Sequence, residues 1–257
     1  MLLFLGVVLM VIAGFYVYSH KHEQKKMSAY GIQFTWDCAG AKQLREAIKP
    51  IANNIIQEEL GLAKDKMLFL GKDHQVLTIF YVDDMMKRDE NILFSMLERM
   101  IHAQQLRPPM HLSLAAQIDF FGENSDEFVV FVDDHHHELA KLNRKMKTII
   151  HALDDQYLRE HHTHFFNRVK SEQFSYVPHI GLGRIRINSI KKHIKDTAQI
   201  DVTLKRIKDR IIQATLHEMG KILVHENKKI TCKKVSIGSF GQGRAQVKEY
   251  QLEHVKK

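Results

Sequence analysis

The apolar positions from Gln75 onward alternate between a strand pattern and a helical pattern. Gln75 to Val82 is rich in β-branched and aromatic residues and predicts a buried strand. Apolar residues at helical spacing then predict a helix at 90–105. Further strands are predicted at 109–114, 127–132 and 178–185, with a helix at 135–153. The order strand, helix, strand, strand, helix, strand is typical of a repeated split β-α-β unit with a mostly antiparallel sheet.

The remainder of the chain predicts one more helix, at 201–223, and two closing strands, at 229–236 and 245–252. The Gly-rich loop 238–243 joins the two strands. It has Gly-Arg followed by a strand, whereas a P-loop needs Gly-Lys-Ser/Thr followed by a helix, so a hairpin loop is predicted. The predicted fold is α+β and two-lobed, with mostly antiparallel sheets and helices packed outside. Each lobe is expected to carry one of the strands 109–114 and 178–185.

The first 18 residues are almost wholly apolar and carry no charge. Such a segment is just long enough to cross a membrane as a helix, and Lys21, Lys25 and Lys26 after it place the rest of the chain in the cytoplasm by the positive-inside rule. A cleaved signal peptide is the alternative, but no Lys or Arg precedes the segment. We therefore expect a single-pass membrane protein with a transmembrane anchor at 1–20, a juxtamembrane and helical extension at 21–70, and the functional domain at 71–257.

The net positive charge of the chain bears on which partners are expected. The chain of 257 residues has a formal charge of +8 and a sequence pI near 9.3. This charge favours an anionic partner, namely a nucleotide, RNA or an acidic membrane surface, although a basic surface without a specific role gives the same total. The two cysteines, Cys38 and Cys232, show neither metal-ligand spacing nor a disulfide framework, which suits a reducing compartment.

Two short segments combine a Pro, a His and a small residue two places later within a strand pattern. The first is Pro-Met-His-Leu-Ser-Leu at 109–114, and the second is Pro-His-Ile-Gly-Leu-Gly-Arg-Ile at 178–185. Positions i and i+2 of a strand share a face, so His111 projects beside Ser113, and His179 beside Gly181. Two imidazoles across one cleft can act as general acid and general base, and this chemistry requires no metal.

The repeated His-x-Ser/Thr-apolar pattern resembles the two-histidine (2H) phosphoesterase superfamily, which includes the 2′,5′ RNA ligase-like proteins and cyclic phosphodiesterases. The first copy, His-Leu-Ser-Leu from His111, matches the family pattern, and the second copy begins 68 residues later at His179. The second copy, His-Ile-Gly-Leu, keeps the His and the apolar residues but has Gly181 where the family has Thr or Ser. The resemblance covers about 76–252, including a closing helix and a pair of strands.

The resemblance implies a metal-independent phosphodiesterase that acts on RNA ends, 2′,5′-linked oligonucleotides or cyclic nucleotides. His111 and His179 would be the catalytic acid and base, and Ser113 would hold a non-bridging phosphate oxygen. Gly181 has no hydroxyl, so either a backbone group serves this oxygen, or the enzyme is weakened, or the protein binds a phosphodiester without cleaving it. The alternative function is therefore a membrane-anchored phosphodiester- or RNA-binding module without turnover.

Residues near the two motifs are candidates for substrate binding. Arg184 and Arg107 would meet the phosphate, and Tyr176 and Phe121 would stack on a base. The run His135-His136-His137 looks like a metal site, but consecutive residues at a helix start cannot ligate one ion together. We therefore expect neither a metal nor a cofactor. The expected partners are the membrane and a substrate that is RNA, an oligonucleotide or a cyclic nucleotide.

Overall fold

The strands of the computed structural model all pair antiparallel. The structure describes residues 27–71, 75–103, 105–109, 111–122, 124–172, 175–240 and 245–252. The strands are β1 Met27–Asp37, β2 Phe69–Gly71, β3 Val76–Met86, β4 Leu112–Phe121, β5 Glu127–Asp134, β6 His179–Ile185, β7 Lys229–Phe240 and β8 Ala245–Gln251. Their order in the sheet is β2-β6-β5-β4-β7-β1-β3, and β8 pairs with β7.

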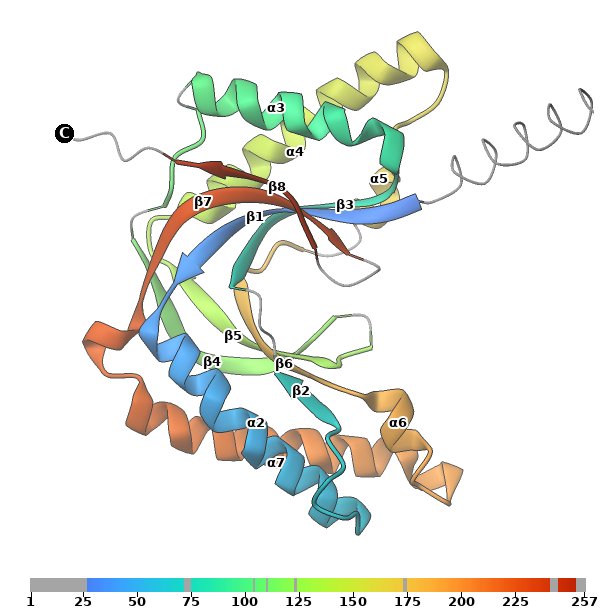
Figure 1. Cartoon of the computed structure of the whole chain (residues 1–257), viewed down its shortest axis with the longest axis vertical. Helices are drawn as coiled ribbons and strands as arrows, with labels where there is room; N and C mark the ends of the chain where they lie inside the picture. Colours follow the sequence, from blue (N-terminus) through green and yellow to red (C-terminus); the bar gives the residue numbers. More distant parts are fainter. Residues whose placement is uncertain are drawn as a thin grey trace, which may run out of the picture.

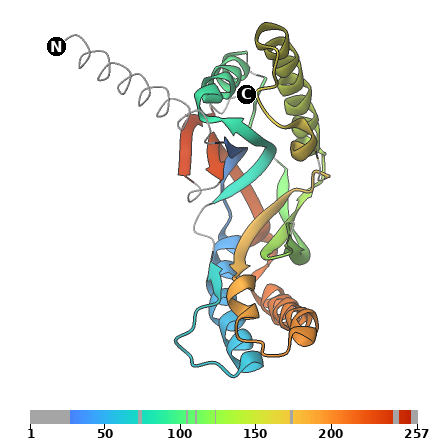
Figure 2. The same cartoon turned by 90° about the vertical axis from the view of Figure 1, so that its right-hand side faces the viewer.

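Helices pack at both ends of this sheet (Figure 1). They are α2 Ala39–Leu60, α3 Glu90–His102, α4 Glu138–His161, α5 Arg168–Ser171, α6 Ile187–Lys191 and α7 Ile200–Ile222. In both views α3 and α4 lie at one end, beside β7, β1 and β3, whereas α2 and α7 lie together at the other end (Figures 1 and 2). Arg210 of α7 donates to Glu58 and Glu59 of α2, and these surface ion pairs bridge the two helices.

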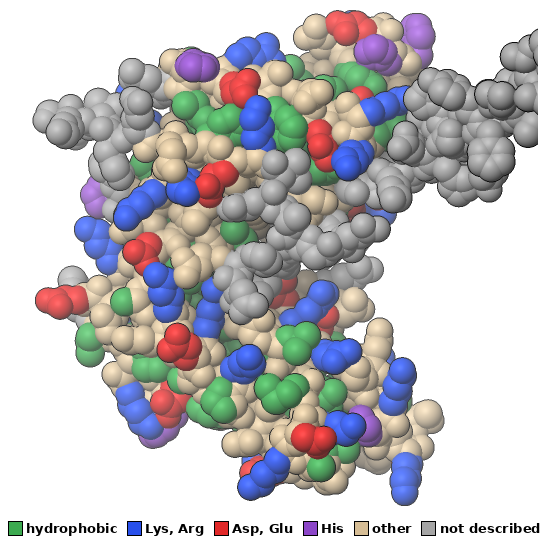
Figure 3. Space-filling model, in the orientation of Figure 1, with side chains coloured by type: hydrophobic (Ala, Val, Ile, Leu, Met, Phe, Trp, Pro, Cys, Tyr) green, Lys and Arg blue, Asp and Glu red, His purple; other side chains and the backbone are tan. Residues whose placement is uncertain are grey.

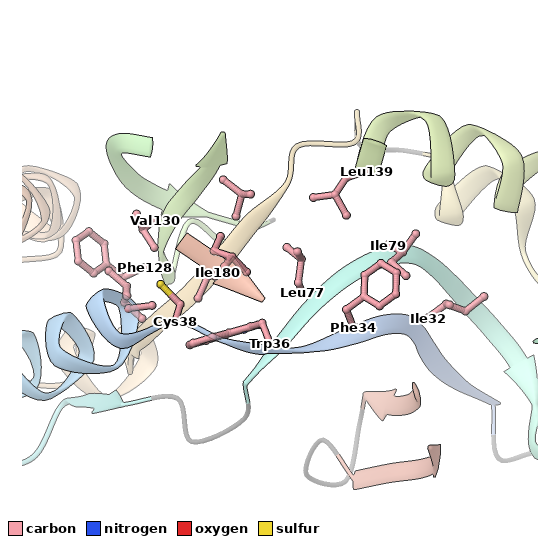
Figure 4. Packing of buried hydrophobic residues seen from close by; sticks show 14 of the residues in the cluster. Ile32, Phe34, Trp36, Cys38, Leu77, Ile79, Phe128, Val130, Leu139 and Ile180 are labelled. Carbon is pink, nitrogen blue, oxygen red and sulfur yellow. The ribbon is translucent and has the colours of Figure 1, made fainter. Parts of the chain in front are cut away.

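The long strand β7 joins the two halves of the sheet. Its first residues pair with β4, Ile230 opposite Leu112, and its later residues pair with β1, Val235 opposite Phe34. Buried apolar side chains of both halves therefore form one cluster. Figure 4 shows part of it, in which Leu77, Ile79 and Phe34 lie on one side and Trp36, Cys38, Phe128 and Ile180 on the other.

The α+β class and the antiparallel sheet are confirmed, and the element order from β3 to β6 is as predicted. The placement of the two motif strands differs from the prediction. β4 and β6 lie in the same half of the sheet, on either side of β5, and not one in each lobe. The reason is the burial of β5 on both faces: Phe128, Val129 and Val130 are all buried, so this strand occupies a central position with a partner on each side.

The sequence predicts a juxtamembrane and helical extension at 21–70. The described part of this segment, from residue 27 onward, belongs to the same fold as the rest of the chain. β1 pairs with both β3 and β7, and the alternate residues Tyr30, Ile32, Phe34 and Trp36 are buried. α2 continues through Pro50, which is exposed, and buries its apolar face against the core. The sheet therefore depends on residues from this segment as well as from 71–257.

None of the helices in the described part of the chain is long and apolar enough to cross a membrane. The long helices α2, α4 and α7 carry charged residues on their exposed faces, as is typical of helices that cover a sheet. The predicted transmembrane helix at 1–20 lies outside the described residues. For the described part of the chain we therefore correct the fold class to α+β without a transmembrane helix. The predictions of a single-pass membrane protein and of a membrane partner have no support in the described residues and are withdrawn.

Candidate functional site

The first motif opens onto a cleft of about 830 Å³, which we call the His111 cleft. The cleft lies where the start of β4, the end of β5 and the start of β7 meet. Its polar and charged lining residues are His111, Ser113, Asp133, His135, His136, Lys228 and Lys229. Three imidazoles, a hydroxyl and two lysines therefore face a single open space.

The imidazole of His111 lies beside a carboxylate and a second imidazole. Nδ1 of His111 is 3.8 Å from Oε1 of Glu138, and Oε2 of Glu138 accepts a hydrogen bond from the His111 backbone N–H at 3.2 Å. The ring of His136 packs edge-on against that of His111, with 4.6 Å between centroids. Asp134 caps the start of α4 by accepting from the backbone N–H of Glu138 at 2.7 Å, which fixes the position of Glu138. The carboxylate of Glu138 therefore lies on the Nδ1 side of the His111 ring.

Ser113 lies between residues of opposite charge. It pairs with Asp133 of β5 on one side and with Lys229 of β7 on the other, and directly opposed residues of a sheet point to the same face. Asp133 is engaged by His135, with Nε2 and Oδ2 3.2 Å apart. The hydroxyl of Ser113 and the ammonium group of Lys229 together favour an anionic oxygen in the cleft.

The second motif opens onto a different cleft, of about 410 Å³, which we call the His179 cleft. Nδ1 of His179 donates to the carbonyl of Val177 at 2.8 Å, which orients the ring. The His179 ring packs against that of Phe121 at 4.4 Å. Tyr176 lies in the same cleft, where its hydroxyl donates to the carbonyl of Thr78 at 3.4 Å, and burial raises the pKa of Tyr176.

The two glycines of the second motif are held by neighbouring elements. The carbonyl of Gly181 accepts hydrogen bonds from Nε and Nη2 of Arg45 at 3.0 and 2.8 Å. A Cβ at Gly183 would meet the ring of Phe69 and lie 2.8 Å from the carbonyl oxygen of Leu70. Gly183 therefore permits the close approach of β2 to β6, which is a packing role.

The predicted cation Arg184 lies apart from both histidine clefts. Its Nε donates to Oδ2 of Asp126 at 2.6 Å, and this hydrogen bond raises the pKa of Arg184. The side chain lines a third cleft beside α6 and α7. Arg107 lines a small cleft of about 300 Å³ between the end of α3 and α4, which Glu138 also lines. Neither arginine lines the cleft of His111 or that of His179.

The structure thus brings His111 to Ser113, and His179 to Tyr176 and Phe121, but it places the two histidines in different clefts. Both β4 and β6 run antiparallel to β5, so the two motifs lie at the same end of this half of the sheet. Their joint action on one phosphodiester stays a prediction.

Four residues around His111 were not predicted from the sequence: Glu138, His136, Lys228 and Lys229. Glu138 had a local signal, because Asp134 precedes it by four residues at a helix start. The lysines had none, since the pairing of β4 with β7 brings together residues that are far apart in the sequence. His135, His136 and His137 form an exposed turn before α4. Among the described residues, no group of three or more His, Cys, Asp or Glu side chains is placed to hold a metal ion.

The fold and these clefts define an α+β protein whose antiparallel sheet carries a histidine at the start of two strands. No family model and no curated protein matches the chain. Two solved structures of Usb1 from Kluyveromyces marxianus are similar to it. The Usb1 structure with uridine monophosphate shares 10% sequence identity with this chain. The similarity covers 88% of this chain and 98% of the Usb1 chain, with a TM-score of 0.46. The other Usb1 structure shares 11% sequence identity, and the similarity covers 87% of this chain and 97% of the Usb1 chain, with a TM-score of 0.49.

Proposed function

We propose that this chain is a metal-independent phosphodiesterase that acts on RNA ends, 2′,5′-linked oligonucleotides or cyclic nucleotides, with His111 and His179 as general acid and base. The observation that carries the proposal is the His111 cleft. An imidazole with a carboxylate at its Nδ1 faces the same space as a hydroxyl and two lysines. This set of groups suits a phosphodiester, because its anionic oxygens need donors and its leaving oxygen needs a proton.

Each residue has a defined role in this reaction. One imidazole takes a proton from the attacking water or hydroxyl, and the other gives a proton to the leaving oxygen as its bond to phosphorus breaks. Ser113 and Lys229 stabilise the charge on the non-bridging oxygens. Gly181 cannot supply the matching hydroxyl on the His179 side, which weakens the enzyme by about 10²-fold relative to one that has both donors.

The reaction requires His111 and His179 to reach the same phosphodiester. Support comes from the register, because both motif strands flank β5 and begin at the same end of it. In both rings the Nδ1 side is occupied, by Glu138 in one and by the Val177 carbonyl in the other, so that Nε2 is the reactive nitrogen in each. Two imidazoles that present equivalent nitrogens suit an acid and a base that exchange protons in turn.

The test is to incubate the full chain with 2′,3′-cyclic nucleotides and 2′,5′-linked oligoadenylate in the presence of EDTA. We expect turnover, and we expect His111→Ala and His179→Ala each to lower kcat by about 10²-fold or more. The double variant should be no worse than either single variant, because residues that act as a unit are not additive. Retained activity in His179→Ala together with loss in His136→Ala would show that His136 is the partner of His111 and that the assignment of His179 is wrong.

A phosphodiester-binding module without turnover is the second candidate. It is favoured by the separate clefts of His111 and His179 and by the missing hydroxyl at Gly181. The same samples distinguish the two functions. Tight binding of the oligonucleotide without any product, at every pH between about 5 and 8 where imidazoles titrate, would support the module and reject the enzyme.

A further inference from the structure

A third cleft, of about 810 Å³, lies at the end of β6 remote from His179, between β6, α6 and α7; we call it the basic cleft. Its charged lining residues are Arg184, Arg186, Lys191, Lys205 and Lys208 against Asp126 and Asp201. In the face that Figure 3 presents, Lys and Arg side chains are scattered with acidic ones between them, so charge alone marks no site. The basic cleft differs because its cations line a concave surface.

The α7 wall of the basic cleft is one helical stripe. Asp201, Leu204, Lys205 and Lys208 recur at the spacing that places residues above one another on a helix. Lys208 projects across the ring of Phe120, with Nζ 5.4 Å from the centroid. Partial burial lowers the pKa of Lys208, against the attraction of Asp126 and Asp119. A cation held in this way, partly removed from water, gains from a ligand that carries negative charge.

Two of the five cations are already neutralised, Arg184 by Asp126 and Lys205 by Asp209. Within the part of the chain that the structure describes, Arg186, Lys191 and Lys208 form no ion pair. Asn124, Asn188 and Ser189 add amide and hydroxyl donors to the lining, and Leu70, 44% exposed, adds an apolar rim. Three cations that form no ion pair among the described residues, on two walls of the cleft, exceed what a single phosphate needs, and they suit several phosphates along a strand.

We propose that the basic cleft binds the phosphate backbone of a single-stranded nucleic acid. Arg186 and Lys191 contact phosphates from the α6 side, Lys208 contacts one from the α7 side, and the asparagines and Ser189 donate to phosphate oxygens. Leu70 packs against a sugar or a base at the rim. This site does not rest on turnover at the histidines, and it would bind the strand equally in a protein without phosphodiesterase activity.

The test measures binding of a fluorescently labelled oligothymidylate of about 12 nucleotides by anisotropy at several salt concentrations. We expect Lys191→Gln/Lys208→Gln to weaken binding about tenfold at low salt. The slope of log K against log salt should shrink by about 1.4, since each phosphate contact on a single strand contributes about 0.7. Lys191→Arg/Lys208→Arg should retain most of the affinity, which separates loss of charge from loss of fold.

The matched control is Lys87→Gln/Arg144→Gln, which removes two exposed cations after β3 and on α4, outside the three clefts. We expect no change in the salt slope for this variant. Equal losses in both double variants would show that only the general surface charge attracts the strand. Competition by uridine monophosphate or inorganic phosphate at the same concentration of phosphate groups as the oligonucleotide would show a single-phosphate site. Either result would overturn the proposal.

Discussion

Glu138 holds His111 at two points, since one carboxylate oxygen lies 3.8 Å from the ring Nδ1 and the other accepts the backbone N–H at 3.2 Å. The pair is partly exposed, so its charge interaction contributes about 1 kcal/mol or less. We expect Glu138→Gln to lower kcat/KM for a 2′,3′-cyclic nucleotide about threefold to fivefold, and the loss should be smaller at high salt because salt screens the interaction.

The control for this variant is Glu160→Gln, on the same helix and 3.9 Å from a different histidine, His161. It should leave kcat/KM unchanged. An equal loss in both variants would contradict a role of Glu138 at His111 and would indicate a general effect of charge on substrate approach.

Restoring a hydroxyl to the second motif should raise activity. Gly181→Thr places a donor on the strand face of His179, and one such donor contributes up to about 10²-fold in rate. The carbonyl of Gly181 is held by Arg45, so the direction of the new side chain is set by a fixed backbone. Steady-state kinetics of Gly181→Thr and Gly181→Ala separate the hydroxyl from the added bulk. Equal rates in both variants and the parent would show that position 181 does not touch the phosphate.

The close packing of β2 on β6 makes Gly183 intolerant of a side chain. A Cβ there meets the ring of Phe69 and the carbonyl of Leu70, so Gly183→Ala should lower the free energy of unfolding by about 1–3 kcal/mol. Gly220, in α7, is the opposite case, because an added Cβ would meet no atom within 4 Å outside its own helix backbone and its chain neighbours. Gly220→Ala should therefore raise the free energy of unfolding by about 0.5–1 kcal/mol. Urea titrations of both variants measure the difference, and a neutral Gly183→Ala would contradict the packing seen here.

Asn53 of α2 forms four side-chain hydrogen bonds, three of which hold the start of β2 at Leu68 and Phe69. Its Nδ2 donates to the carbonyls of Lys49 and Phe69, each at 2.9 Å, and its Oδ1 accepts from the backbone N–H groups of Leu68 and Phe69 at 2.8 and 2.9 Å. Asn53→Leu leaves these buried groups without a partner and should cost about 3 kcal/mol. Asn54→Leu, at the exposed neighbouring position, should change stability by less than about 0.5 kcal/mol.

His151 makes stability depend on pH. Burial lowers its pKa, an effect that outweighs the attraction of Glu172, whose Oε1 is 2.7 Å from Nε2. The unfolded chain takes up a proton at His151 near pH 6.5, whereas the folded protein does so only at lower pH, so this group destabilises the fold as pH falls below about 6.5. His151→Gln should reduce the loss of stability between about pH 7.5 and 5.5, as measured by urea titration. The exposed His217→Gln should not reduce it.

Local patterns of apolar residues were sufficient to predict most of the helices and strands. The helical and strand periods of 75–252 predicted β3 to β8 and the long helices α3, α4 and α7 in the correct order, because each of these elements must bury one face or stripe. The short helices α5 and α6 were not predicted. The strand β1 was not assigned, although the alternation of Tyr30, Ile32, Phe34 and Trp36 was visible. The transmembrane prediction at 1–20 rested on the length of an uncharged apolar segment and on the lysines that follow it. That segment lies outside the described residues, among which no helix could cross a membrane.

The sequence by itself determined the α+β class, the antiparallel strands and the two His-x-small motifs, because these depend on spacing within short segments. Only the tertiary structure decided which strands are neighbours. The burial of β5 on both faces placed β4 and β6 in one half of the sheet, and the pairing of β7 with β4 brought Lys229 beside Ser113. The exposed stripe of α7, the end of β6 and the short helix α6 together form the basic cleft. Such contacts follow from how whole faces pack, and no spacing along the chain specifies them.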